Sequence, residues 1–464
     1  MSSSPPNVIV FFTDQQRWDT SGLHGNPLEL MPNFDRVANE GTHFVNAFTC
    51  QPVCGPARSS MQTGMYATKT GVTRNGIPLA ENANTLARSF ASAGYQTGYI
   101  GKWHLGGVHV DFTGQQGPVP VDKRGGYKYW LAAEHVEFVS DAYDAVLFDT
   151  DNNRVKLPGY RVDATTDAGI RFVDSNRDKP FMLFLSFLEP HHQNTTDSYP
   201  APPGYQERYT GRWLPGDLAA LSGTAHQHIG GYFGMVKRLD EAFGRLLDAL
   251  ESLGIADNTI VMFTSDHGNH FKTRNWEYKR SPHESCVRIP AAVCGPGFNG
   301  GGHVKQLVST VDFFPSLLDA ANLPIPDSVQ GRSVLPLLRS QTDQWPEEVF
   351  IQISESQVGR AVRTARWKYS VVAPGKDGYK DAGSDHYIEE FLYDLHADPH
   401  ELDNLISVDA YVVVRNKMKS RLLSRMEQAG EAIPSIGPAA EADVDQLRQT
   451  DMIQRRILDN EVNQ

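Results

Sequence analysis

The chain has 464 residues, of which 40% are hydrophobic, and a formal net charge of −12 at pH 7. A chain of this length exceeds one ordinary hydrophobic core, so we expect a large domain followed by a smaller one, and the hydrophobic content is that of a globular protein. The negative charge argues against binding to nucleic acids or anionic membranes, and no stretch is long and apolar enough to cross a membrane.

The chain opens with a pattern typical of a parallel sheet. Residues 7–13 (N-V-I-V-F-F-T) form a continuous apolar run, which predicts a strand buried on both faces. The run ends in Asp14 and Gln15, and ligands of open α/β sheets gather beyond the carboxyl ends of the strands. Residues 31–41 then read as a helix with a glycine at its end.

The segment 54–64 (C-G-P-A-R-S-S-M-Q-T-G) is the most informative part of the chain. Pro56 suits the first turn of a helix and Gly64 suits a helix end, so Cys54 is predicted at a helix N-terminus. Unpaired N–H groups and the helix dipole favour an anion there. Arg58 lies one helical turn further on and would project from the same face.

This segment resembles the signature of the type I sulfatases of the alkaline phosphatase superfamily, C-x-P-S/A-R-x-x-x-L/M-x-T-G, and matches every fixed position. In that family an enzyme oxidises the cysteine to formylglycine, an aldehyde. The resemblance therefore implies that Cys54 is the precursor of the catalytic residue and that a formylglycine-generating enzyme acts on the chain during maturation. A hydrated aldehyde explains the chemistry: one hydroxyl takes the sulfate, and deprotonation of the other expels it.

Residues 84–94 read as a helix and residues 96–101 as a short strand. The strand leads into Gly101-Lys102-Trp103-His104-Leu105-Gly106, a second segment that the sulfatase family shares. From there to about residue 160 the pattern mixes glycines and aromatic residues. Such a segment is either a lid over the active face or an excursion with a small sheet of its own.

The next part of the chain alternates between helices and strands. Residues 162–175 and 224–253 read as helices, and residues 181–188 and 259–264 as further fully apolar strands. The first of these strands leads to His191 and His192, and the second to Asp266 and His267. Residues 288–294 and 306–310 predict strands, and 312–321 a helix. Asp14 and Asp266 should thus meet at one edge of the sheet.

Composition shifts near residue 343, where we place the boundary between a catalytic domain (1–343) and a C-terminal α+β subdomain (344–464). Short alternating runs at 349–354, 361–364, 367–372 and 391–395 predict an antiparallel sheet. Residues 407–430 read as an amphipathic helix and 441–457 as a polar helix or frayed tail. Residues 360–369 and 392–405 also resemble the C-terminal subdomain of sulfatases.

Four residues form the candidate metal site: Asp14, Gln15, Asp266 and His267. Hard divalent cations take oxygen ligands, and carboxylates at converging strand ends supply them. In the resembling family the corresponding segments hold calcium. Gln15 stands where many members carry an aspartate, and His267 stands where asparagine is common. We therefore expect Ca²⁺, with Mg²⁺ or Mn²⁺ as alternatives, and His267 as a ligand or a substrate contact.

Positive charge for a sulfate comes from Arg58, Lys102 and Lys279, the last in a segment that resembles the family pattern K-x-x-x-x-E-x-x-x-R-x-P. Arg58 would orient the formylglycine, and the two lysines would bind sulfate oxygens. Either His104 or His191 would be the general base, and His267 or the other of that pair would support the leaving oxygen as the acid. Substrate contacts are expected from His192, Arg274, Trp276 and His283.

The sequence thus predicts a large mostly parallel sheet between helices, plus a small subdomain with an antiparallel sheet, acting as a sulfatase on a sulfated small molecule or glycan. Aromatic residues in the expected lid loops favour a carbohydrate sulfate over an aryl sulfate. These residues are Tyr127, Tyr129, Trp130, Tyr199, Tyr205, Trp213 and Trp276. The alternatives are an aryl sulfatase, a phosphonate or phosphate ester hydrolase on the same scaffold, a non-catalytic anion-binding protein, and a cysteine-nucleophile hydrolase. The oligomeric state stays open.

The N-terminal residues lack the basic and apolar regions of a signal peptide, and four cysteines form no dense disulfide framework. We therefore expect a cytoplasmic protein.

Overall fold

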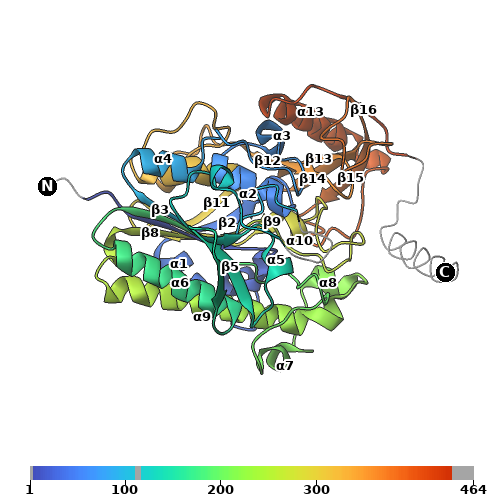
Figure 1. The fold of residues 1–464 in the computed structure, drawn as a ribbon. Helices are drawn as coiled ribbons and strands as arrows, with labels where there is room; N and C mark the ends of the chain where they lie inside the picture. Colours follow the sequence, from blue (N-terminus) through green and yellow to red (C-terminus); the bar gives the residue numbers. More distant parts are fainter. Residues whose placement is uncertain (1–3, 110–115, 441–464) are drawn as a thin grey trace.

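The computed structural model describes residues 4–109 and 116–440, which form a large α/β domain and a smaller subdomain (Figure 1). The large sheet has 11 strands, in the order β11-β2-β10-β8-β1-β7-β3-β4-β5-β6, with β9 paired to β2. Its centre consists of β1 (Asn7–Thr13), β8 (Thr259–Ser265), β7 (Phe181–Ser186) and β3 (Gln96–Lys102), all parallel. The prediction of a mostly parallel central sheet is confirmed.

The remaining strands extend this centre on both sides. On one side lie β10 (Ala291–Cys294), β2 (Thr42–Phe48), β11 (Gly302–Ser309) and the short β9 (Arg288–Ile289). β10 and β9 run antiparallel to their neighbours, whereas β11 is parallel to β2. The predicted strand 288–294 is thus two strands, separated at Pro290, which has no N–H for a ladder hydrogen bond.

Helices cover both faces of the large sheet (Figure 1). One core joins Ile9 and Phe11 to α1 (Pro32–Glu40), α6 (Arg161–Asn176) and α9 (Ala225–Ser252). The other joins Val8, Val10 and Phe12 to α2 (Cys54–Thr63), α4 (Leu86–Ser92) and α11 (Thr310–Ala320). Alternate residues of β1 therefore face opposite layers, which is why its sequence is apolar throughout.

The segment after β3 adds strands to the large sheet. β4 (Tyr129–Ala133) runs parallel to β3, and β5 (Ala145–Asp149) and β6 (Arg154–Leu157) follow as an antiparallel hairpin. Neither of the two expectations for this segment, a lid or a separate small sheet, describes these strands. Tyr127 and Trp130 are buried against Tyr99, so the expectation that these two rings contact a sugar is wrong. The aromatic rings pack the sheet edge.

The C-terminal subdomain contains a five-stranded sheet, and the prediction of an antiparallel sheet is confirmed for four of its strands. β12 (Glu348–Ile353), β13 (Gly359–Thr364), β14 (Trp367–Val372) and β15 (His386–Asp394) are antiparallel, and β16 (Ser435–Gly437) adds a parallel edge. Helix α13 (Val412–Gln428) begins five residues later than expected, after a 3-10 turn at Asp409–Tyr411. The predicted domain boundary at residue 343 stays a prediction, and the predicted helix 441–457 lies outside the described residues.

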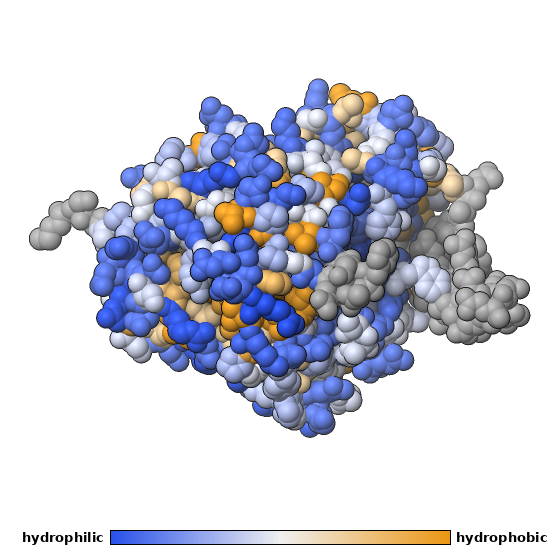
Figure 2. Space-filling view, in the orientation of Figure 1, coloured by the Kyte–Doolittle hydropathy of each residue, from blue (hydrophilic) through white to orange (hydrophobic). Residues whose placement is uncertain are grey.

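The face in Figure 2 is mostly hydrophilic, with apolar residues in small areas only. Among the helices that the structure describes, none combines the length and apolar character needed to span a bilayer.

Candidate active site

Cys54 is the first residue of α2, as predicted, and only 1% of its surface is exposed. Val53 before it is extended, and Gly64 ends the helix in the left-handed conformation at φ 68°. The N–H of Gly55 donates to Asn75 Oδ1 at 2.9 Å, which fixes the start of the helix. All ten residues of α2 are buried, so the helix presents Cys54 at a fixed point in the interior of the protein.

The Cys54 thiol lies among cationic groups. Its Sγ is 2.9 Å from Lys279 Nζ, 3.8 Å from Lys102 Nζ and 3.4 Å from His267 Nε2. Burial and the nearby charge of Asp14 raise the pKa of this thiol, but the two lysines and His267 outweigh them and lower it to about 6. The position therefore stabilises an anion, although the protein as a whole is strongly acidic.

Arg58 lies one turn along α2 and binds the acidic strand end rather than Cys54 itself. Its Nη2 is 2.9 Å from Asp14 Oδ2 and 3.5 Å from Asp266 Oδ2. Its Nη1 donates to Ser186 Oγ at 2.7 Å and to the Lys102 carbonyl at 2.8 Å. The guanidinium thus connects the ends of β1, β8, β7 and β3, and holds Asp14 in place.

The four predicted metal ligands meet at the carboxyl ends of β1 and β8, where Thr13 pairs with Ser265. Asp266 Oδ1 accepts the N–H groups of Gln15 (2.9 Å) and His267 (2.8 Å). Asp14, Cys54, Asp266 and His267 place ligand atoms within 4.8 Å of one another. Burial, followed by the charge of Asp14, raises the pKa of Asp266 to about 7.

Unpartnered oxygens make this site suited to a cation. Both amide atoms of Gln15 and Oδ2 of Asp266 are buried without a hydrogen-bond partner. Gln15 also holds a left-handed backbone conformation, at φ 67°. Buried polar atoms without partners are costly, and a hard divalent cation would satisfy the oxygens. The donor set of two carboxylates, an amide and an imidazole therefore fits such an ion.

Hydrogen bonds fix the protonation of two histidines. His267 Nδ1 lies 2.9 Å from the Gly268 carbonyl, and His191 Nδ1 lies 2.6 Å from the His192 carbonyl. Because a carbonyl only accepts, each Nδ1 carries the proton and each Nε2 faces the cluster. His191 Nε2 is 3.2 Å from Lys279 Nζ. Burial and Lys279 lower the pKa of His191 well below its usual range, so this imidazole is neutral.

The other predicted base, His104, is also neutral because burial and His135 lower its pKa well below the usual value. Its Nδ1 has no hydrogen-bond partner, and its ring meets that of His135 edge-on with centroids 4.5 Å apart. The pKa of His267, by contrast, is raised: burial lowers it, but the charge of Asp266 outweighs this. Of the three histidines considered for proton transfer, His104 and His191 are therefore neutral, and His267, the one in contact with Cys54, is more basic.

Glu137 is a site residue that the sequence reasoning missed. It lies in the short helix α5 (Val136–Val139), and its Oε1 is 3.0 Å from Lys102 Nζ, which also lies 2.9 Å from Asp14 Oδ2. Burial raises the pKa of Glu137, but Lys102 outweighs it and lowers the value to about 2. No local pattern marks this residue. Ser186, in contrast, could have been found, because it is the polar residue at the end of an apolar strand.

The four predicted substrate contacts have different positions. His192 stacks on His191 with centroids 4.3 Å apart, and Trp276 is 45% exposed. Arg274 donates to the carbonyls of His400 and Glu401, and His283 Nε2 is 3.2 Å from Tyr393 OH. These contacts of Arg274 and His283 lie in the C-terminal subdomain, so both residues help to attach it to the catalytic domain.

Comparisons with known proteins agree with this geometry. A model of the sulfatase family matches residues 6–323, and a model described as N-sulphoglucosamine sulphohydrolase, C-terminal, matches residues 273–428. An ulvan-active sulfatase of Formosa agariphila is 28% identical, over 93% of this chain and 83% of the relative. An N-acetylglucosamine-6-O-sulfatase of Bacteroides thetaiotaomicron is 26% identical, over 91% and 86%.

A solved structure in complex with D-glucosamine-2-N,6-O-disulfate shares the fold. It superposes with a TM-score of 0.75 at 24% identity and covers 92% of this chain and 98% of its own.

Proposed function

The chain belongs to the sulfatase family and is a sulfuric ester hydrolase, and from this we propose that it releases sulfate from a carbohydrate with a formylglycine made from Cys54 and a divalent metal ion. The observation that carries the proposal is the position of Cys54 at the start of a buried helix, between Lys102, Lys279 and the acidic strand ends. A thiol alone gives no reason for these aspartates.

The aldehyde supplies, when hydrated, two hydroxyls on one carbon, so that sulfate can be taken up and released without attack of water on sulfur. The metal ion, held by Asp14, Gln15, Asp266 and His267, would polarise the sulfate oxygens. Oxygen-rich ligands favour Ca²⁺, with Mg²⁺ or Mn²⁺ as alternatives.

The chain's own cations hold the reacting group. Lys279 Nζ and Lys102 Nζ lie 2.9 Å and 3.8 Å from Cys54 Sγ, so both ammonium groups can bind sulfate oxygens and stabilise negative charge that develops on them. Glu137 and Asp14 together hold Lys102 in place. The burial of all three charged groups excludes water, which strengthens these interactions.

The histidines divide the proton transfers. His104 and His191 are neutral at neutral pH and can accept a proton, so either can be the general base. His267 keeps its Nδ1 proton on the Gly268 carbonyl, so only its Nε2 faces the site. This nitrogen either binds the metal ion or, because the pKa is raised, carries a proton for the leaving oxygen. We propose Trp276 and His192 as contacts to the sugar, since Trp276 is exposed and His192 stacks beside the base candidate His191.

The carbohydrate substrate is supported by the named relatives, which act on ulvan and on N-acetylglucosamine-6-O-sulfate, and by the structural neighbour that holds a sulfated glucosamine. The formylglycine-generating enzyme would be the partner during maturation.

The test begins with the protein co-expressed with a formylglycine-generating enzyme. Oxidation should lower the mass of the tryptic peptide 37–58 by about 18 Da, with fragment ions locating the change at Cys54 rather than Cys50 in the same peptide. Sulfate release from sulfated sugars should rise with the extent of oxidation, and Cys54→Ala should abolish it. If sulfate, phosphate and phosphonate esters of one leaving group are compared and the phosphonate reacts fastest, the sulfatase proposal is wrong.

A further inference from the structure

A groove of about 610 Å³ lies where the edge of the large sheet meets the C-terminal subdomain. Four segments line it: the edge strand β11, residues 342–347 before β12, the turn between β13 and β14, and one face of α13. On α13 the lining residues Val413, Lys417 and Arg421 are spaced by four, so they share a helix face. None of the residues placed above in the catalytic site lines this groove.

The groove is cationic on an acidic protein. Lys305, Arg366, Lys417 and Arg421 line it, against the single carboxylate of Glu347. Arg366 pairs with Asp394, and Arg421 pairs with Glu347 and Glu348. Lys305 and Lys417 are exposed, and the ion pairs among the described residues include neither of them. These two ammonium groups are available to an anionic ligand.

Two tryptophans form apolar walls beside these charges. Trp345 is fixed by its indole N–H, which donates to the Leu307 carbonyl at 2.8 Å. Trp367 contacts the Arg366 guanidinium, 4.9 Å from the ring centroid, and Tyr411, with ring centroids 5.9 Å apart. Rigid aromatic faces beside cations suit a ligand that combines sugar-like C–H surfaces with anionic groups.

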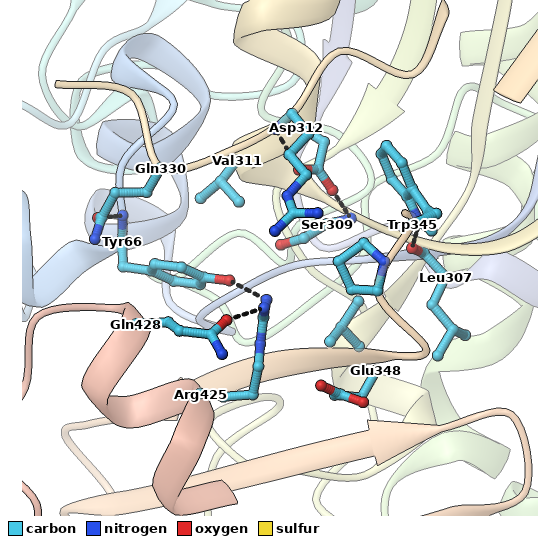
Figure 3. A pocket seen from close by; sticks show the side chains of 13 residues that line it. Tyr66, Leu307, Ser309, Val311, Asp312, Gln330, Trp345, Glu348, Arg425 and Gln428 are labelled. Atoms are coloured by element: carbon cyan, nitrogen blue, oxygen red, sulfur yellow. Dashed lines mark hydrogen bonds between the residues drawn. The ribbon is translucent and has the colours of Figure 1, made fainter. Parts of the chain in front are cut away.

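A second cavity of about 280 Å³ lies next to the groove, and Leu307, Trp345 and Pro346 line both. Tyr66, Arg425 and Gln428 lie on one side of this cavity and Trp345 on the other (Figure 3). Arg425 donates to Tyr66 OH and Gln428 Oε1, while its buried Nε has no partner. The lining also includes Gln330, whose amide bonds the Tyr66 N–H and the Ala429 carbonyl, and the carboxylates of Asp312 and Glu348, so the cationic part of the site is the groove itself.

The backbone of β11 is irregular at this place. The register between β11 and β2 shifts between Val304 and Leu307, which brackets Lys305. A bulge re-aims side chains at a sheet edge. A lysine at an edge strand also protects against edge-to-edge pairing, but that role requires neither the second lysine on α13 nor the tryptophan walls.

We propose that this groove is a non-catalytic binding site for a sulfated polysaccharide. It would bind sugar units that lie far along the polysaccharide from the sulfate ester that is hydrolysed. The proposal rests on the proposed carbohydrate substrate. Charge complementarity favours a sulfated chain over a neutral one, because two of the four cations of the groove, Lys305 and Lys417, form no ion pair among the described residues of a protein of net charge −12. Such a site would raise the affinity for long substrates without changing the chemistry at Cys54.

The test uses the full-length protein with Lys305→Glu and Lys417→Glu combined. The matched control combines Lys128→Glu and Lys179→Glu, two exposed lysines elsewhere that give the same change in charge. Retention is measured by native electrophoresis in gels that contain dextran sulfate or unsulfated dextran. We expect the groove variant to bind dextran sulfate about tenfold more weakly than the control variant, and neither to bind dextran.

Activity supplies a second readout. KM for a long sulfated substrate should rise about tenfold in the groove variant with kcat unchanged, while turnover of a sulfated monosaccharide stays within about twofold of the control. If both variants bind dextran sulfate equally weakly, or if neither binds it more weakly than the unmodified protein, the groove is not the binding site. If the groove variant loses binding to phosphatidylserine vesicles, and dextran sulfate does not retain even the unmodified protein, the ligand of the groove is not a glycan. Because electrophoresis needs no turnover, failure of the carbohydrate sulfatase proposal would appear separately, as an absence of sulfate release from every sugar.

Discussion

The stabilisation of this protein by a divalent ion should depend on pH, because Asp266 must lose its proton to become a ligand. Burial and the charge of Asp14 raise the pKa of Asp266 to about 7. Above pH 7 the carboxylate is ready for the ion. Below pH 7 each unit of pH lowers the apparent affinity up to tenfold, which is about 1.4 kcal/mol.

The size of the effect follows from mass action. At pH 8, an ion at 100 times its Kd adds about 2.7 kcal/mol to the free energy of unfolding. With 464 residues the unfolding entropy is about 1 kcal/mol/K, so Tm should rise by about 3 °C. At pH 6 the same ion concentration is only about ten times Kd, and the rise should be about 1.5 °C. At pH 5 it should fall below about 0.5 °C.

The assay is differential scanning calorimetry of the full chain in EDTA and in CaCl₂, with MgCl₂ and MnCl₂ in parallel, at each pH. Asp266→Asn should remove both the ion-dependent shift and its pH dependence. Asp240→Asn is the matched control, since Asp240 is also a buried carboxylate with a pKa raised by burial, to about 6, but it accepts hydrogen bonds from the start of α1. A shift of equal size at every pH, or one that Asp266→Asn leaves intact, would refute the reasoning.

Three further substitutions test the site and the fold. Gln15→Glu adds a carboxylate beside Asp14 and Asp266, so Tm in EDTA should fall by about 1–3 °C while the calcium shift grows; an unchanged shift would argue against Gln15 as a ligand. Glu137→Gln removes one of the two carboxylates that hold Lys102. We expect kcat/KM for a sulfate ester to fall about tenfold, while Tm falls by no more than about 3 °C. Unchanged kinetics would contradict the role of Glu137 in positioning Lys102. Glu390 is half-buried, and the burial of its carboxyl group raises its pKa to about 7. The folded protein therefore binds more protons than the unfolded chain between about pH 4.5 and 7, and stability falls as pH rises through that window. Glu390→Gln keeps an acceptor for Gln357 and Ser370, so it should raise Tm by about 2–3 °C at pH 8 and by nothing at pH 4; a gain of equal size at both pH values would contradict the assignment.

Several features of the site follow from local patterns in the sequence. The apolar runs of β1 and β8 predict strands buried on both faces, and their ends predict that Asp14 and Asp266 meet, which the register of Thr13 with Ser265 confirms. The glycine and proline of the segment 54–64 predict a helix that starts at Cys54. Strand burial and helix ends are encoded by neighbouring residues, so one sequence suffices to predict them.

Contacts between distant segments depended on the tertiary structure. Lys279, 225 residues along the chain, contacts Cys54 Sγ. Glu137 contacts Lys102 from a segment whose strands were not predicted, because its sequence shows no alternating pattern. The same packing buries Trp130, which was expected to face a sugar, and directs Arg274 and His283 to the C-terminal subdomain. A sequence specifies which side chains are apolar or charged, but the order of strands in the sheet and the docking of the subdomain decide which of them meet, because these depend on the summed packing of the whole chain.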